Sequence, residues 1–178
     1  MCIRDRLPTD KIILLPNNKN IILAAEAARD LSVKQVAVVP SRSAPQGIAA
    51  LMALNPDGDV AANAEAMTRA LSLVKTGEIT RATRSVEIDG VDVAEGQIIG
   101  LAEGRLVCAG PDEWDVLNAL LQRLDAAACD IVTLYYGADV TTAQAAEAAD
   151  TIRRSYPDLE VEVIEGGQPH YFYILGAE

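Results

Sequence analysis

A strand–helix–strand pattern near the N-terminus constrains the fold more than any other feature of the sequence. The apolar run Ile12 to Leu15 precedes an alanine-rich helical segment, Ile21 to Leu31, and a second apolar run follows at Val36 to Val39. Both runs are short, uniformly apolar and closed by a proline, which is typical of parallel strands covered on both faces. The pattern therefore predicts a βαβ unit with a right-handed crossover.

The same pattern returns near the C-terminus. Residues 130–137 read "DIVTLYYG" and predict a strand, residues 140–156 predict a helix, and residues 160–164 predict a second strand. The segment "HYFYIL" then predicts a final strand. We therefore expect an α/β fold in which two βαβ units form mainly parallel sheets.

The sequence between the two units has a different pattern. Short β-type runs alternate with the turn signals Asp89-Gly90, Glu95-Gly96 and Glu103-Gly104, which indicates successive antiparallel strands. Residues 1–6 show no strand pattern and no signal-peptide pattern, and we expect them to be a non-native leader. The rest of the chain is expected to be one α/β domain with three parts: residues 7–75, the first βαβ unit plus helices; residues 76–110, an antiparallel β-hairpin insert; and residues 111–178, a helix at about 112–124, the second βαβ unit and the final strand.

The charge balance excludes several classes of partner. Lys and Arg total 15 against 26 Asp and Glu, and the formal net charge of -11 would repel nucleic acid and anionic membrane surfaces. No apolar run approaches the roughly 20 residues of a membrane-spanning helix. The three cysteines and the single histidine lie too far apart for a disulfide framework or a zinc site. We therefore expect a cytoplasmic protein with reduced thiols and no bound metal.

Two polar loops follow the strands of the first unit. "NNKN" follows the first strand and "SRSAPQG" follows the second. Because the carboxyl ends of parallel strands meet at one edge of a sheet, where open α/β sheets bind ligands, we expect the loops to converge there. Turn formation, with Asn20 capping the following helix, explains the asparagines equally well. The candidate contact residues of the two loops are Asn17, Asn18, Lys19, Asn20, Arg42, Gln46 and Gly47.

A second turn and a basic segment carry weaker signals. The turn "GGQPH" adds Gly166, Gly167 and Gln168 to the candidate contact residues. His170 has no neighbouring nucleophile or carboxylate motif, so a structural role is expected for it. Lys75, Arg81 and Arg84 form a locally basic segment, for which a solvated face is the first interpretation and a partner contact the second. No phosphate-binding loop or catalytic motif occurs, so no catalytic residue is predicted.

Several motifs in uninterrupted order resemble one known family. They are "LLPNNKNI", "PQG", Asn63 with Met67, "VKTGEITRATRS", "GQIIG", "YYGAD" and "GGQPHYFYILGAE". From about Leu7 to Glu178 the chain is similar to the C-terminal region of DAK2-domain, dihydroxyacetone-kinase-like proteins, whose characterised members are the ATP-binding subunit of bacterial fatty acid kinase. His170 departs from the family pattern, in which an apolar residue is more frequent at this position.

The resemblance implies a function for the intact protein. A DhaL-like helical domain with metal-binding aspartates holds ATP and Mg²⁺ and phosphorylates a fatty acid that a separate, DegV-like acyl-binding subunit carries. The C-terminal domain is implied to dock that subunit, and no cofactor is implied for it. The resemblance also implies that the first βα segment of this domain is missing here, so we expect an open sheet edge beside Ile12 to Leu15.

The sequence and the resemblance lead to two candidate functions from different classes. The first is a partner-docking domain of a fatty acid kinase-type protein, with homodimerisation as a further association that the chain allows. The second is a stand-alone α/β module whose strand-end loops bind a small anionic ligand directly. In either case we expect this chain alone neither to bind ATP with Mg²⁺ nor to transfer phosphate, because it lacks a phosphate cradle and a set of metal-binding carboxylates.

Overall fold

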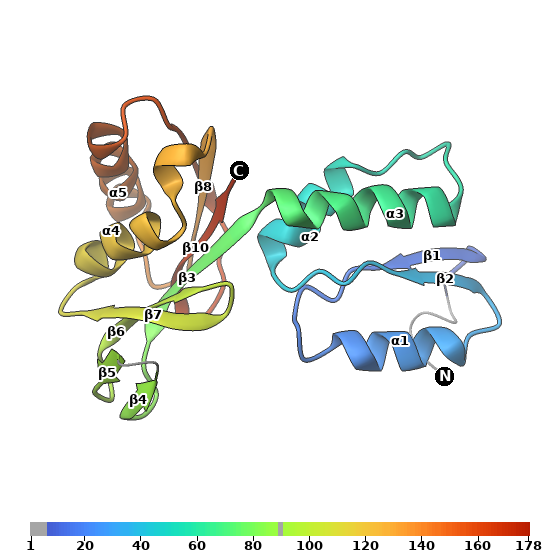
Figure 1. Ribbon diagram of the computed structural model, residues 1–178, viewed down its shortest axis with the longest axis horizontal. Helices are drawn as coiled ribbons and strands as arrows, with labels where there is room; N and C mark the ends of the chain where they lie inside the picture. The colour runs from blue at the N-terminus through green and yellow to red at the C-terminus, as the bar shows by residue number, and fades with distance from the viewer. Residues whose placement is uncertain (1–6, 89–90) are drawn as a thin grey trace. The chain divides into compact units, whose positions relative to one another are not determined.

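The computed structural model describes residues 7–88 and 91–178, which divide into two compact units with the boundary between Val74 and Lys75 (Figure 1). The expected leader, residues 1–6, and the expected Asp89-Gly90 turn lie outside the described residues. Each unit has its own strands and its own buried side chains, and each is described separately.

The first unit contains the predicted βαβ pattern. Strands β1 and β2 pair in parallel, with Lys11 opposite Gln35 and Leu14 opposite Val38. Figure 1 shows α1 on one face of this strand pair and α2 with α3 on the other. The elements are β1 (Lys11–Leu14), α1 (Ile22–Asp30), β2 (Gln35–Val38), α2 (Ala44–Met52), α3 (Val60–Ala70) and a 3₁₀ turn, η2 (Leu71–Leu73).

The core of the first unit lies on the α2 and α3 side of the strand pair. Val39 and Ala50 are fully buried there, and Met67 is 1% exposed. Helix α1 contributes no buried residue, and its Leu23 is 78% exposed. The expectation that both faces of the strands are well covered is therefore wrong for the α1 face. Among the described residues β1 pairs only with β2, and the open edge expected beside β1 stays a prediction.

The start of α1 differs from the expected one. Ile21 occupies the N-cap position and provides no side-chain cap. Asn20 lies one residue too early: its backbone N–H donates to Asn18 Oδ1 at 2.9 Å, and the Ile21 N–H donates to the Asn18 carbonyl at 3.1 Å. The prediction that Asn20 caps this helix is wrong, because Asn18 uses its side chain to close a local turn.

We expect Asn20→Ala to change the free energy of unfolding by less than about 0.5 kcal/mol, because no cap is lost. Asp59→Ala is the matched comparison, since Asp59 is also exposed but caps α3 by accepting from the Ala62 N–H at 2.8 Å. Losing that cap should cost about 1 kcal/mol. Urea unfolding of both variants checks this, and an equal loss in both would restore Asn20 as a cap.

The second unit is built on a six-stranded sheet with the order β7-β6-β3-β10-β8-β9. Strands β4 and β5 form a separate two-stranded antiparallel sheet. The elements are β3 (Lys75–Arg81), β4 (Val86–Ile88), β5 (Val91–Val93), β6 (Ile98–Ala102), β7 (Arg105–Gly110), α4 (Glu113–Arg123), a 3₁₀ turn η3 (Ala126–Ala128), β8 (Ile131–Tyr136), α5 (Thr142–Ser155), β9 (Glu160–Glu165) and β10 (Tyr171–Ala177).

The large sheet corrects one part of the sequence prediction. The second βαβ unit is present, because β8 and β9 pair in parallel across α5. Every other pair in this sheet is antiparallel, so it is not the mainly parallel sheet that was expected. The reason is that β10 lies between β8 and β3 and pairs with both, which joins the expected insert to the βαβ strands in one sheet.

Two helices cover one face of the large sheet. Helix α4 packs over β3, β6 and β7, and α5 packs over β8 and β9 (Figure 1). Their inward side chains share one core, in which Leu117, Leu120 and Leu121 of α4 are buried as the helical spacing predicted. Helix α5 begins with a capping box in which Thr141 and Gln144 bond reciprocally. The central strand β10 thus lies between the strands that α4 covers and the strands that α5 covers.

Candidate functional site

The two strand-end loops of the first unit converge, and Ser41 joins them. Ser41 is fully buried directly after β2, and its hydroxyl donates to Asn17 Oδ1 at 2.7 Å. The Asn17 N–H donates to Ser41 Oγ at 3.0 Å. Asn17 has a φ of 53°, a left-handed conformation that asparagine tolerates better than most residues. The strand-end loop after β1 is therefore fixed to the loop after β2 at one point.

The loop after β2 is held by its own hydrogen bonds. Ser43 caps α2 by accepting from the Gln46 N–H at 3.3 Å, and Gln46 Oε1 accepts from the Arg42 N–H at 2.9 Å. Gly47 lies against the Asn17 side chain so closely that a Cβ at this position would overlap the amide. Gln46 and Gly47 are buried, so they support the loop from the interior of the unit.

The remaining candidate residues of these loops are exposed. Asn17, Asn18, Lys19 and Asn20 reach solvent after β1, and Arg42 reaches solvent after β2. Neither loop contains an acidic residue, so two cations share one edge of a chain whose formal net charge is -11. We call this surface, formed by Asn17 to Asn20 and Arg42, the strand-end edge. A fixed backbone with exposed cations suits contact with an anionic group or surface.

We expect Ser41→Ala to lower the free energy of unfolding of the first unit by about 1–3 kcal/mol, because a buried hydroxyl that bonds Asn17 twice is lost. The exposed Ser72, whose hydroxyl donates to the Arg69 carbonyl, provides the control Ser72→Ala. Chemical denaturation measures both, and hydrogen exchange should show faster exchange of the Asn17 amide in Ser41→Ala alone. Unchanged exchange at Asn17 would mean that Ser41 does not fix the loop.

The other three candidate residues belong to the second unit. The N–H groups of Gly166 and Gly167 donate to the Tyr136 carbonyl at 3.0 and 3.2 Å. Gln168 Nε2 donates to the Tyr135 carbonyl at 2.9 Å. Gly167 has a φ of 63°, which a glycine adopts without strain. These contacts make the segment a structural turn between β9 and β10, and nothing in them recruits a ligand.

The basic segment is partly engaged within the second unit. Lys75 Nζ donates to the Leu124 carbonyl at 2.9 Å. Arg81 Nη1 donates to the Gly96 carbonyl at 2.9 Å, and its guanidinium lies 5.3 Å from the centre of the Phe172 ring. The His170 carbonyl accepts from the Thr80 hydroxyl at 2.6 Å, a backbone contact that makes no use of the imidazole. Lys75 and Arg81 therefore have structural contacts that the sequence did not indicate.

Residues 7–88 and 91–178 contain neither a metal-binding cluster nor a membrane-spanning helix. No group of three or more His, Cys, Asp or Glu side chains there could hold a metal ion. No helix in the same residues is long and apolar enough to cross a membrane.

The fold is similar to that of fatty-acid-binding proteins of the DegV type. The fatty acid kinase B3 protein of Streptococcus pneumoniae, solved with linoleic acid, aligns with a TM-score of 0.66 at 11% identity and covers 98% of this chain and 74% of its own. DegV of Bacillus subtilis, a fatty acid binding protein, aligns with a TM-score of 0.59 at 13% identity, over 94% of this chain and 71% of its own. At such identities the similarity defines the fold alone.

The family follows from sequence. This chain belongs to the FakA-like C-terminal family of fatty acid kinase, whose model matches residues 4–178. Protein YloV of Bacillus subtilis is 36% identical over 169 residues, which are 95% of this chain and 31% of that protein. A protein of Staphylococcus aureus strain USA300 is 37% identical over 168 residues, or 94% of this chain and 31% of its own. The chain thus spans about a third of the length of these relatives.

Proposed function

We propose that this chain is the partner-docking domain of a fatty acid kinase-type protein, whose intact form phosphorylates a fatty acid held by a DegV-like acyl-binding subunit. The family match across residues 4–178 carries this proposal. ATP and Mg²⁺ belong to another part of the intact protein in this account. We assign no step of phosphate transfer to this chain. The free thiols of Cys108 and Cys129 suit a cytoplasmic protein.

The strand-end edge is the surface that we assign to docking. Hydrogen bonds through Ser41 and Gln46 fix the backbone on both sides of Arg42, so little loop ordering would be needed on binding. Lys19 lies two residues beyond Asn17, whose position Ser41 fixes. Because the two cations stand out from an acidic chain, the complementary surface of the partner is acidic.

A small anionic ligand at the same edge is the second candidate function. The two cations favour it, as does the N-terminus of α2, which Ser43 and Gln46 surround. However, Ser43 Oγ and Gln46 Oε1 already accept hydrogen bonds from the loop itself. Few preformed polar contacts therefore remain for a small ligand, whereas a protein surface needs only the exposed side chains.

Sedimentation of this chain with an acyl-binding subunit from the same organism separates the two functions. We expect a complex that contains one copy of each chain, and no detectable affinity for inorganic phosphate or short-chain carboxylates. Tight binding of such an anion, without capture of the subunit, would support the second function and contradict the first. Self-association of the chain alone, measured in the same runs, tests the homodimer.

A further inference from the structure

A cavity of about 360 Å³ lies in the second unit, which does not contain the strand-end edge. Helix α4 contributes Glu113, Trp114 and Leu117 to its lining, α5 contributes Glu147 among others, and β10 contributes Tyr173. The cavity forms because α4 covers β3, β6 and β7 while α5 covers β8 and β9, so the space between the helices lies over β10. Its volume is at the small end of the range for small-molecule sites.

Tyr173 supplies a polar group inside this cavity. Its side chain is only 3% exposed, and its hydroxyl has no hydrogen-bond partner among the described residues. No fully buried side-chain nitrogen or oxygen in the same residues lacks a partner, so the hydroxyl must face open space, which is the cavity that Tyr173 lines. A buried hydroxyl in this position is left to bond with whatever enters the cavity.

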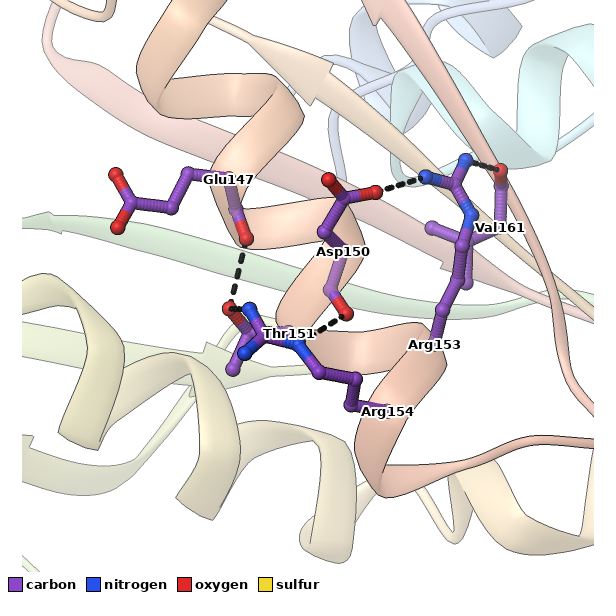
Figure 2. Close-up of polar contacts among 6 residues, drawn as sticks. All are labelled: Glu147, Asp150, Thr151, Arg153, Arg154 and Val161. Atoms are coloured by element: carbon purple, nitrogen blue, oxygen red, sulfur yellow. Dashed lines mark hydrogen bonds and ion pairs between the residues drawn. The ribbon is translucent and has the colours of Figure 1, made fainter.

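Two carboxylates give the cavity its charge. Neither Glu113 nor Glu147 has a hydrogen bond or an ion pair to its carboxylate within residues 7–88 and 91–178. Figure 2 shows the Glu147 carboxylate extending away from the Asp150–Arg153 ion pair on the same helix. Burial, followed by the charges of Glu113 and Glu147, raises the pKa of Tyr173 to about 12, so the phenol stays protonated at neutral pH.

Arg81, the cation whose charge acts on Glu113, does not pair with the Glu113 carboxylate. Burial raises the pKa of Glu113, and Arg81 acts in the opposite direction through its charge. Yet the Arg81 guanidinium donates to the Gly96 carbonyl and lies over the Phe172 ring, and it forms no ion pair with Glu113. The two glutamates that line the cavity, half-buried Glu113 and exposed Glu147, therefore have no positively charged side chain in contact with their carboxylates among the described residues.

The apolar part of the lining completes the recognition pattern. Trp114 and Leu117 offer an indole and an aliphatic surface beside the carboxylates, and Ala148 adds to the apolar wall. An indole face attracts cations as well as apolar groups. We propose that this cavity binds an organic cation, an alkylammonium or alkylguanidinium group, with its head between Glu113, Glu147 and the Tyr173 hydroxyl and its stem against Trp114.

Three ligands of six carbons each test the proposal, which does not depend on the docking function. Trp114 is the single tryptophan of the chain, so its fluorescence reports on the cavity directly. At about pH 8, hexylammonium should bind saturably and at least about tenfold more tightly than 1-hexanol, and hexanoate should not bind. Equal binding of hexanol, or preference for hexanoate, would overturn the proposal.

Variants locate the cation head. Glu113→Gln and Glu147→Gln should each weaken hexylammonium binding about fivefold or more, and Tyr173→Phe should weaken it less. Asp150→Asn is the matched control, since Asp150 lies on the same helix but pairs with Arg153 at 2.9 Å outside the cavity lining. Circular dichroism melts verify that each variant is folded. Loss of binding in Asp150→Asn equal to that in Glu147→Gln would show a general charge effect and contradict the site.

Further ligands distinguish two sources of the cation, a side chain of a partner protein and a free amine. N-acetyl-lysine methylamide and N-acetyl-arginine methylamide represent side chains of a protein, and hexylammonium represents a free amine. Tighter binding of a capped amino acid supports the site and assigns it to a partner's side chain, whereas tighter binding of hexylammonium supports the site and assigns it to a small metabolite. Failure of all three to perturb Trp114 fluorescence would contradict the cation site.

Discussion

Gly137→Ala is expected to destabilise the second unit by about 3 kcal/mol. A Cβ at this position would overlap the Tyr171 carbonyl oxygen and lie 2.7 Å from the Gln168 carbonyl oxygen. Both are backbone atoms, so no side-chain rotation can relieve the contact. The Gly137 N–H also donates to the Phe172 carbonyl at 2.8 Å, which holds the two segments together at the point of conflict.

The neighbouring backbone has little freedom to move. Tyr171 begins β10, which pairs with β3 on one side and with β8 on the other. The Gln168 carbonyl accepts from the Ala138 N–H at 3.1 Å, and the Gln168 side chain binds the Tyr135 carbonyl. Moving either segment would therefore break several hydrogen bonds of the central sheet, which is why we expect a large effect.

Gly167→Ala is the matched control for this prediction. Gly167 lies in the adjoining turn with a φ of 63°, and no atom within 4 Å would meet an added Cβ. Only backbone strain remains, and it should cost about 1–2 kcal/mol. Thermal and urea unfolding of both variants measure the difference. A loss in Gly137→Ala no greater than in Gly167→Ala would mean that the backbone at Gly137 yields without penalty.

The first unit shows what a single sequence can predict about a site. Short apolar runs, each closed by a proline, were sufficient to predict both strands, and parallel strand ends were sufficient to predict that Asn17 and Gln46 lie on joined loops. Ser41 was missed as the residue that joins them, because a serine after a strand has no signature of complete burial. Asn20 was assigned to a cap because its residue type suits one, whereas the turn that Asn18 closes shifts the helix start.

The second unit shows which features of the fold could not be predicted from sequence patterns. Local periodicity found β8, α5, β9 and β10, but the order of strands in a sheet depends on pairing between distant segments. The antiparallel partners of β10 were therefore not predicted. The cavity was missed for a similar reason: Glu113 and Glu147 look like solvated helix residues until the spacing between α4 and α5 brings them to one opening.

Charge reversal on the strand-end edge should have the largest effect on binding. We expect Lys19→Glu with Arg42→Glu to weaken affinity for the acyl-binding subunit by about a hundredfold, because each favourable contact with an acidic surface becomes a repulsive one. Both side chains are exposed, so the fold should tolerate the changes. This loss of affinity should become smaller as the salt concentration is raised, since screening reduces repulsion between surface charges.

The most direct test is a calorimetric titration of the acyl-binding subunit into the full-length protein, unmodified or carrying Lys19→Glu with Arg42→Glu. Arg84 is an exposed residue of the basic segment in the second unit. Arg84→Glu serves as the control, because it also replaces a positive charge with a negative one. We predict a large loss of affinity at low salt for the double variant and unchanged affinity for Arg84→Glu. Unchanged affinity of the double variant, with a loss in Arg84→Glu, would contradict this prediction and place docking on the second unit.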